Sequence, residues 1–200
     1  TINADEEIFL DRHQNITGFG QINAAIDTAE NSTITASGGQ LALGDASDFK
    51  GFDVAGDIVV ESGASLLIND RDFARLGELK TLQGGTIQAG NGLVLASGLV
   101  IDGHGVIEGK VAADFGSTIN ASGGNLQIGS NGSFDGFFSD GQMFTNDNDV
   151  EILDADAAVL GSLTDMGTDT ADGTLTATNG FLLEQGKSVI GRGTISGDFE

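Results

Sequence analysis

Acidic side chains gather in two parts of the sequence where they could bind a metal ion. Asp147 and Asp149 form one group, and Asp165 and Asp169 form the other. Calcium takes about six to eight oxygen ligands from carboxylates and carbonyls in loops of this kind. Neither group contains the Asp-x-Asp-x-Asp-Gly loop and distal Glu of an EF-hand. We therefore predict no cofactor. Calcium at these four residues is a hypothesis, and the simpler interpretation is that they are solvated turn residues.

Glycine pairs form a second pattern with possible chemistry, because glycine-rich loops can hold phosphate groups. The pairs are Gly18 with Gly20, Gly103 with Gly105, and Gly191 with Gly193. A further glycine, Gly109, comes one residue too late for the dinucleotide-binding fingerprint, and the residues around it are apolar and strand-like rather than helical. We interpret all three pairs as structural turns.

Catalytic residues do not form a recognisable set. His13 and His104 are the only histidines, and they do not occupy equivalent positions of the repeat described below. Carboxylates are plentiful, and glycosidases need two of them, so a polysaccharide-degrading enzyme is an alternative to a structural protein. The eight Lys and Arg residues are scattered, however, and the chain has no Trp or Tyr to stack against a sugar. We expect that the chain is not an enzyme.

The charge of the chain limits its partners. The formal net charge is −22, with 30 Asp and Glu against eight Lys and Arg. Nucleic acids and anionic membrane surfaces bind clustered cations, so we expect neither as a partner. The most apolar run, residues 92–101, is about half as long as a membrane span, and we expect no membrane insertion. The absence of cysteine is compatible with an exported protein.

The composition favours many short strands joined by tight turns. The chain has 32 Gly, no Pro and 39% hydrophobic residues, which is enough for a packed core. Gly, Asn and Asp adopt the positive φ angles of turns, whereas Ile, Val, Thr and Phe suit strands. The missing prolines fit, because an interior strand uses every N–H group in its ladder.

The chain repeats itself with a period of about 85 residues. Residues 32–39 match residues 117–124 at every position except one, where Thr35 stands against Asn120. The pattern from Asp70 to Leu79 returns from Asp154 to Leu163, at an offset of 84. We therefore divide one continuous segment, 1–200, into repeat 1 (1–85), repeat 2 (86–173) and the start of repeat 3 (174–200).

A shorter period of about 15 to 20 residues lies inside the long one. Most of these units carry a short apolar strand, a turn of Gly, Asn or Asp, and a second apolar strand. One such unit cannot bury its apolar face alone, but a stack of units can. The sequence thus predicts an all-β protein, a parallel β-helix or β-solenoid with one unit per coil. Tandem small β-sandwich domains are the alternative.

Two blocks carry a resemblance to known proteins. Ser-Thr-Ile-x-Ala-Ser-Gly-Gly begins at Ser32 and Ser117, and Ile-x-Gly-x-Gly-x-Ile begins at Ile16 and Ile101, with a shortened form at Ile190. In these blocks the chain resembles the repeat regions of large secreted bacterial surface proteins. Such proteins include autotransporter passengers, filamentous-haemagglutinin-like adhesins and envelope-anchored Gly-rich extracellular proteins. The resemblance implies a right-handed β-helix, secretion, and roles in adhesion or fibre formation.

The pattern and the resemblance together predict a secreted structural protein at the cell surface or outside the cell. We expect it to form a stiff fibre, surface layer or matrix by continuous β-stacking. Its main partner would be itself, through head-to-tail contacts or continuation in a longer repeat chain. The cell envelope or glycans are further possible partners, and the stalk of an adhesin is the alternative function.

Overall fold

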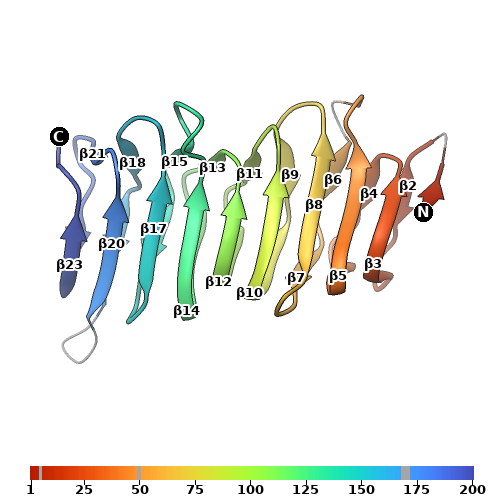
Figure 1. The fold of residues 1–200 in the computed structure, drawn as a ribbon, viewed down its shortest axis with the longest axis horizontal. Helices are drawn as coiled ribbons and strands as arrows, with labels where there is room; N and C mark the ends of the chain where they lie inside the picture. The colour runs from red at the N-terminus through yellow and green to blue at the C-terminus, as the bar shows by residue number, and fades with distance from the viewer. Residues whose placement is uncertain (5, 49–50, 168–171) are drawn as a thin grey trace.

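The computed structural model describes residues 1–4, 6–48, 51–167 and 172–200, and the side chain of Lys80 is outside the description. Within these residues the protein is all-β and contains no helix. The strands stack side by side along one axis, and the two termini lie at opposite ends of the stack (Figure 1). The chain therefore rises steadily from one end to the other, as a solenoid requires.

The strands form two sheets, and neighbouring strands run parallel, as in the pairs of β3 with β5 and of β11 with β13. The nine strands of sheet B are β2 (Ile8–Leu10), β4 (Ile26–Thr28), β6 (Phe52–Val54), β9 (Ala74–Leu76), β11 (Leu93–Leu95), β13 (Val111–Ala113), β15 (Phe137–Ser139), β18 (Ala158–Leu160) and β21 (Phe181–Leu183).

Sheet A contains the other 14 strands of the described residues. They are β1 (Ile2–Asn3), β3 (Asn15–Asn23), β5 (Thr33–Asp45), β7 (Asp57–Val60), β8 (Ser65–Asp70), β10 (Glu78–Ala89), β12 (Val100–Glu108), β14 (Thr118–Gly129), β16 (Gln142–Phe144), β17 (Asp149–Leu153), β19 (Leu163–Asp165), β20 (Gly173–Ala177), β22 (Val189–Ile190) and β23 (Gly193–Ser196).

One coil consists of a sheet B strand and the sheet A strands that follow it. We number the coils 1 to 9, from the coil that begins with β2 to the coil that begins with β21. Sheet A bends in the middle of each coil. In coil 2, for example, Thr33–Ala36 pairs with β7 and Gln40–Asp45 pairs with β8. Each coil thus has a sheet B strand and two arms of sheet A, which we call the first and second arm.

The 85-residue period of the sequence corresponds to four coils. The first residues of coils 1 to 5 are Ile8, Ile26, Phe52, Ala74 and Leu93, at spacings of 18, 26, 22 and 19 residues. Coils 5 to 8 repeat this order with lengths of 18, 26, 21 and 23 residues. Coils 1, 4 and 5 fall within the expected 15 to 20 residues, and the others are longer because larger loops connect their strands.

The apolar side chains point inward and form one continuous core through all nine coils. In the first arm, Ile34, Ile58, Leu79, Ile101 and Ile119 stack in register, and each is at most 1% exposed. Each such burial stabilises the fold by about 1.5–3 kcal/mol before entropy is counted. The predicted parallel β-solenoid is therefore confirmed, and the alternative of separate sandwich domains, each with its own core, does not apply.

One expected equivalence between the repeats is wrong in register. The sequence match paired Leu79 with Leu163, but Leu163 lies on the outer face of β19 and is partly exposed. The fully buried Thr164 takes the inward position and pairs with Met143, as Leu79 pairs with Ile58. A shift of one residue along a strand moves every side chain to the other face, so the core of coil 8 contains a threonine.

Candidate functional site

The predicted Gly-x-Gly pairs form the corner between the two arms of sheet A. The φ angles of all six glycines are positive, between 98° and 155°. A Cβ at Gly105 in coil 5 would also lie 2.4 Å from the carbonyl oxygen of Gly85 in coil 4, so only glycine fits there. The pairs bend the strand, and no helix follows them within the described residues. Phosphate binding at a helix N-terminus therefore has no structural basis here.

The side chain of the residue between the two glycines packs against the corner of the next coil. A Cβ built at Gly39 in coil 2 would lie 3.4 Å from Phe19 of coil 1. A Cβ built at Gly124 in coil 6 would lie 3.0 Å from the ring of His104 in coil 5. The ring nitrogen Nδ1 of His104 also lies 3.2 Å from the carbonyl oxygen of Ser122. His104 is thus a packing residue at a corner, and the two sequence blocks recur together because they contact each other on adjacent coils.

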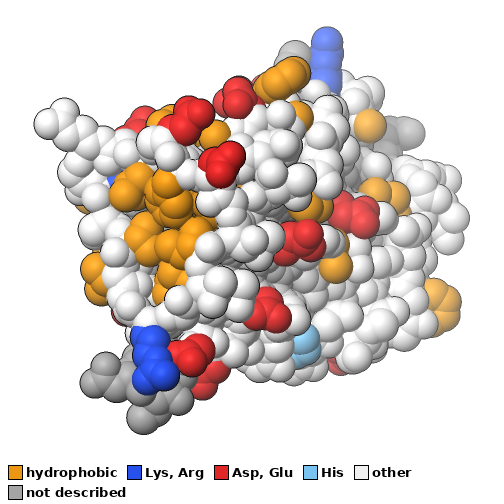
Figure 2. All heavy atoms as spheres, turned by 60° about the vertical axis from the view of Figure 1, so that its left-hand side comes forward, with side chains coloured by type: hydrophobic (Ala, Val, Ile, Leu, Met, Phe, Trp, Pro, Cys, Tyr) orange, Lys and Arg blue, Asp and Glu red, His pale blue; other side chains and the backbone are white. Residues whose placement is uncertain are grey.

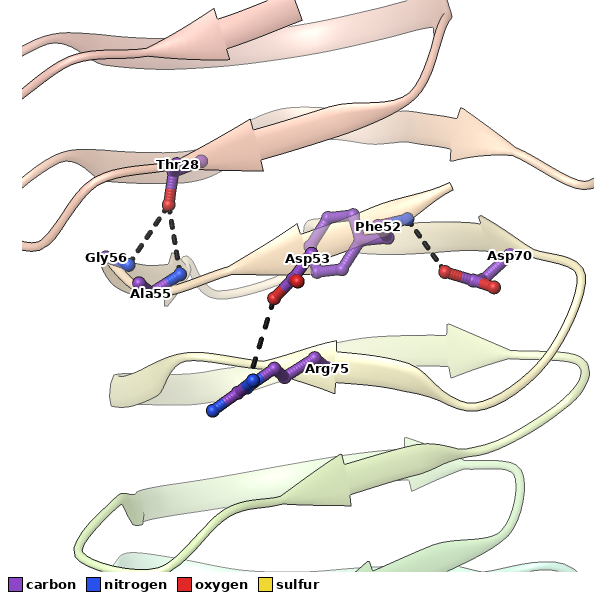
Figure 3. A network of polar contacts seen from close by, with 7 residues as sticks. All are labelled: Thr28, Phe52, Asp53, Ala55, Gly56, Asp70 and Arg75. Carbon is purple, nitrogen blue, oxygen red and sulfur yellow. Dashed lines mark hydrogen bonds and ion pairs between the residues drawn. The ribbon is translucent and has the colours of Figure 1, made fainter. Parts of the chain in front are cut away.

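Two buried aspartates hold the loops between coils, and we did not single them out from the sequence as functional. The Oδ2 atom of Asp70 accepts a hydrogen bond from the backbone N–H of Phe52 at 2.8 Å (Figure 3). In repeat 2, Asp154 accepts the equivalent bond from Phe137 at 2.9 Å. Both aspartates are at most 5% exposed. The match of Asp70 with Asp154 between the repeats is the sequence signal that could have identified these aspartates, and it reflects a structural role.

Three of the four calcium candidates, Asp147, Asp149 and Asp165, lie in the described part of the chain, and they do not come together there as a metal site. Asp149 begins β17 in the second arm of coil 7, whereas Asp165 ends β19 in the first arm of coil 8. No group of three or more His, Asp or Glu side chains that could hold a metal occurs among the described residues. Asp169 lies outside those residues. The geometry of Asp147, Asp149 and Asp165 gives the calcium hypothesis no support, and it stays a prediction.

The carboxylate of Asp45 has a perturbed pKa, and its cause is local. The hydroxyl and the backbone N–H of Ser47 donate hydrogen bonds of 2.7 and 2.8 Å to the Oδ1 atom of Asp45. These bonds favour the ionised carboxylate and hold the pKa of Asp45 below its ordinary value. This is the geometry of a turn that an aspartate stabilises with its own side chain, so the shift does not mark a catalytic acid.

Two of the shallow grooves on the surface contain polar side chains that pair with each other. One groove, of about 480 Å³, includes Gln127 and Glu151, and the amide of Gln127 donates a hydrogen bond of 2.6 Å to Glu151. The other, of about 380 Å³, lies beside sheet B, where Arg75 is 3.9 Å from Asp53 (Figure 3). Among the residues that line these grooves there is no nucleophile with an adjacent base, which a catalytic site needs.

The C-terminal end of the stack leaves part of the core uncovered. Leu183, Val189 and Ile195 pack against the core but are partly exposed, and Phe199 is 45% exposed. Figure 2 shows hydrophobic side chains gathered on this end of the molecule. In the described residues, β22 and β23 pair only with strands of coil 8, so their other edges are open. We call these four side chains and two strand edges the C-terminal face.

These observations define a parallel β-solenoid built from four-coil repeats, with an open edge and an uncovered core at one end. Comparisons with protein-family models, with curated proteins and with solved structures found no match for the chain. No helix in the described ranges is long and apolar enough to cross a membrane. The resemblance to bacterial surface proteins stays a prediction, as do the location, the partners, the adhesin alternative and the expectation that the chain is not an enzyme.

Proposed function

We propose that this protein is an extracellular structural repeat protein that serves as a stiff scaffold in a fibre, surface layer or matrix. The observation that carries the proposal is the single apolar core that runs through all nine coils. A molecule with this core is a rod by construction, since the core and the strand ladders pack each coil against its immediate neighbours. Nine coils at the usual strand spacing give a length of about 40 Å.

The stiffness of the rod follows from the direction of its hydrogen bonds. In a parallel stack the backbone ladder runs along the axis, so bending the rod stretches ladder bonds and opens the packed interior. The glycine corners add to this, because the close approach of Gly105 to Gly85 leaves no space for the coils to slide. A scaffold needs this resistance to bending.

Extension of the scaffold would use the open ends of the stack. An unpaired strand edge presents N–H and C=O groups that template another strand. In our proposal that strand belongs either to a second copy, in a head-to-tail contact, or to additional polypeptide of the same kind. The net charge of −22 keeps neighbouring rods apart laterally, so that growth is favoured along the axis.

Negative-stain electron microscopy of the purified protein over a range of concentrations tests this function. The proposal predicts straight particles of constant width, some of them several times longer than one chain at high concentration. Straight particles of one uniform short length at all concentrations would contradict the self-association part of the proposal. Flexible or globular particles would contradict the scaffold function itself.

A further inference from the structure

We propose that the C-terminal face is a docking face for one kind of coil, namely a coil with the Ser-Gly-Gly corner found in coils 2 and 6. In coil 2 this corner is Ser37, Gly38 and Gly39, and in coil 6 it is Ser122, Gly123 and Gly124. The inference rests on the proposed scaffold function and names the partner that extends this end.

Coil 9 is a coil of the same kind as coils 1 and 5. Its corner glycines, Gly191 and Gly193, have φ angles of 98° and 155°, and those of the pairs in coils 1 and 5 are also positive, between 125° and 132°. Gly193 lies opposite Gly173 of the preceding coil, just as Gly105 lies opposite Gly85. The kind of coil that covers coils 1 and 5 therefore indicates what fits coil 9.

Coils 1 and 5 are both covered by a coil with the Ser-Gly-Gly corner, and in the same register. Gly18 and Gly20, with one residue between them, lie opposite Ala36 and Leu41, which have four residues between them. In the same way, Gly103 and Gly105 lie opposite Ala121 and Leu126. The covering coil therefore bulges at the corner, and its bulge is the Ser-Gly-Gly segment.

The bulge accommodates the side chain between the two corner glycines. Phe19 in coil 1 and His104 in coil 5 each lie against the glycines of the covering coil, with Cβ clearances of 3.4 Å at Gly39 and 3.0 Å at Gly124. Arg192 is the equivalent residue of coil 9. Its side chain is 62% exposed, and its Nε atom is 2.6 Å from Asp172 of the preceding coil. A long side chain at this place requires glycine in the coil above it.

The uncovered positions of coil 9 are core positions in coil 5. Leu183, Val189 and Ile195 correspond, at an offset of 88, to Leu95, Ile101 and Ile107, which are at most 1% exposed. Phe199 already takes the place of the first residue of a covering coil. It forms a parallel bridge with Phe181, as Val111 does with Leu93, and the two rings are 5.3 Å apart.

A second copy of the chain offers a poorer match to this face than a coil with the Ser-Gly-Gly corner. Coils 2 and 6 are both covered on their two sides, by coils 1 and 3 and by coils 5 and 7. The first full coil at the N-terminal end of a second copy is coil 1, where Phe19 stands between the corner glycines. The partner is therefore a coil with the Ser-Gly-Gly corner, in which no long side chain stands at that place.

The experiment appends candidate coils to the complete chain. Glu200 stands at the position of Ala112, so residues 113–136 appended after Glu200 supply a coil of the proposed kind. A second variant appends residues 113–157, which adds coil 7 so that the new coil is itself covered. The matched controls carry the same two extensions with both corner glycines, the copies of Gly123 and Gly124, changed to Val. A third control appends residues 95–110 of coil 5.

Hydrogen exchange of the backbone amides of β22 and β23 is the measurement. With the two extensions that keep the copies of Gly123 and Gly124, we expect exchange that is slower by about tenfold or more than with any control. The strands β22 and β23 then lie inside the ladder. Equal protection by all extensions, or protection by none, would overturn the proposal. The proposal would also be overturned if the unextended chain formed end-to-end particles and every extension abolished them. The face would then bind a second copy of the chain. Electron microscopy of the unextended chain reports separately on the rod itself.

Discussion

The ammonium group of Lys187 lies 2.7 Å from the Oδ1 atom of Asp140 and joins coil 9 to coil 7 across the coil between them. The side chain of Lys187 is only 16% exposed. At the equivalent positions of the preceding repeat, Leu99 and Ala55 line one groove beside sheet B. The same structural position is therefore closed by an ion pair in one repeat and left open with apolar residues in the other.

The first prediction concerns this ion pair. Lys187→Leu should lower the stability of the C-terminal coils by about 1 kcal/mol, because Asp140 loses its partner while remaining partly exposed. The double variant Asp140→Ala with Lys187→Leu installs the pair found in the preceding repeat and should recover most of the loss. Urea denaturation of the three proteins is the measurement. A double variant less stable than Lys187→Leu would contradict the equivalence of the two positions.

The second prediction concerns the buried aspartates. Asp154→Ala should lower the free energy of unfolding by about 1–3 kcal/mol, because the buried N–H of Phe137 then has no acceptor. Asp147→Ala is the matched control, since Asp147 is exposed, and it should change stability by less than about 0.5 kcal/mol. Equal effects of the two substitutions in thermal denaturation would show that the hydrogen bond from Phe137 to the carboxylate of Asp154 does not stabilise the fold.

The third prediction concerns the threonine in the core of coil 8. Thr164 is fully buried, and its hydroxyl has no hydrogen-bond partner among the described residues. Thr164→Val keeps the shape and removes the unsatisfied hydroxyl, so it should raise the free energy of unfolding by about 1 kcal/mol. Thr118→Val, on the outer face of β14, controls for the general preference of valine for strands. A lower melting temperature for Thr164→Val would mean that Thr164 does not point into the core.

The fourth prediction compares two corner glycines with nearly equal φ angles, 128° for Gly20 and 132° for Gly105. A Cβ at Gly20 meets nothing within 4 Å, whereas a Cβ at Gly105 lies 2.4 Å from the oxygen of Gly85. Gly20→Ala should therefore cost about 1–2 kcal/mol from backbone strain. Gly105→Ala should cost about 1–3 kcal/mol more, because the neighbouring coil must also move. Equal denaturation midpoints would contradict this spacing of coils 4 and 5.

Much of the fold could be predicted from the sequence because stacking repeats the same physical problem in every coil. The Ser-Thr-Ile-x-Ala-Ser-Gly-Gly and Ile-x-Gly-x-Gly-x-Ile blocks mark bends where glycine is required, and the alternating Leu41 and Leu43 mark an inward face. These local signals are enough to indicate parallel coils. They also indicate the corner position of His104, which the structure places against Gly124.

Other features could not be predicted because they depend on register across coils. Leu163 looked like the partner of Leu79, yet the chain between Gly161 and β19 brings Thr164 inward instead. The contact of Lys187 with Asp140 joins residues 47 positions apart in the chain and has no counterpart in the first repeat. The calcium candidates were suggested by the number of acidic residues near them in the sequence, but Asp149 and Asp165 lie on different arms of sheet A in different coils.

The central claim is that one continuous core makes this chain a rod whose length follows the number of coils. Small-angle X-ray scattering tests it on a variant in which the four coils of residues 86–173 are duplicated. The account predicts an unchanged cross-section and a length greater by about 19 Å, four times the strand spacing. A wider particle, or a scattering curve of separate globules joined by a flexible segment, would contradict it.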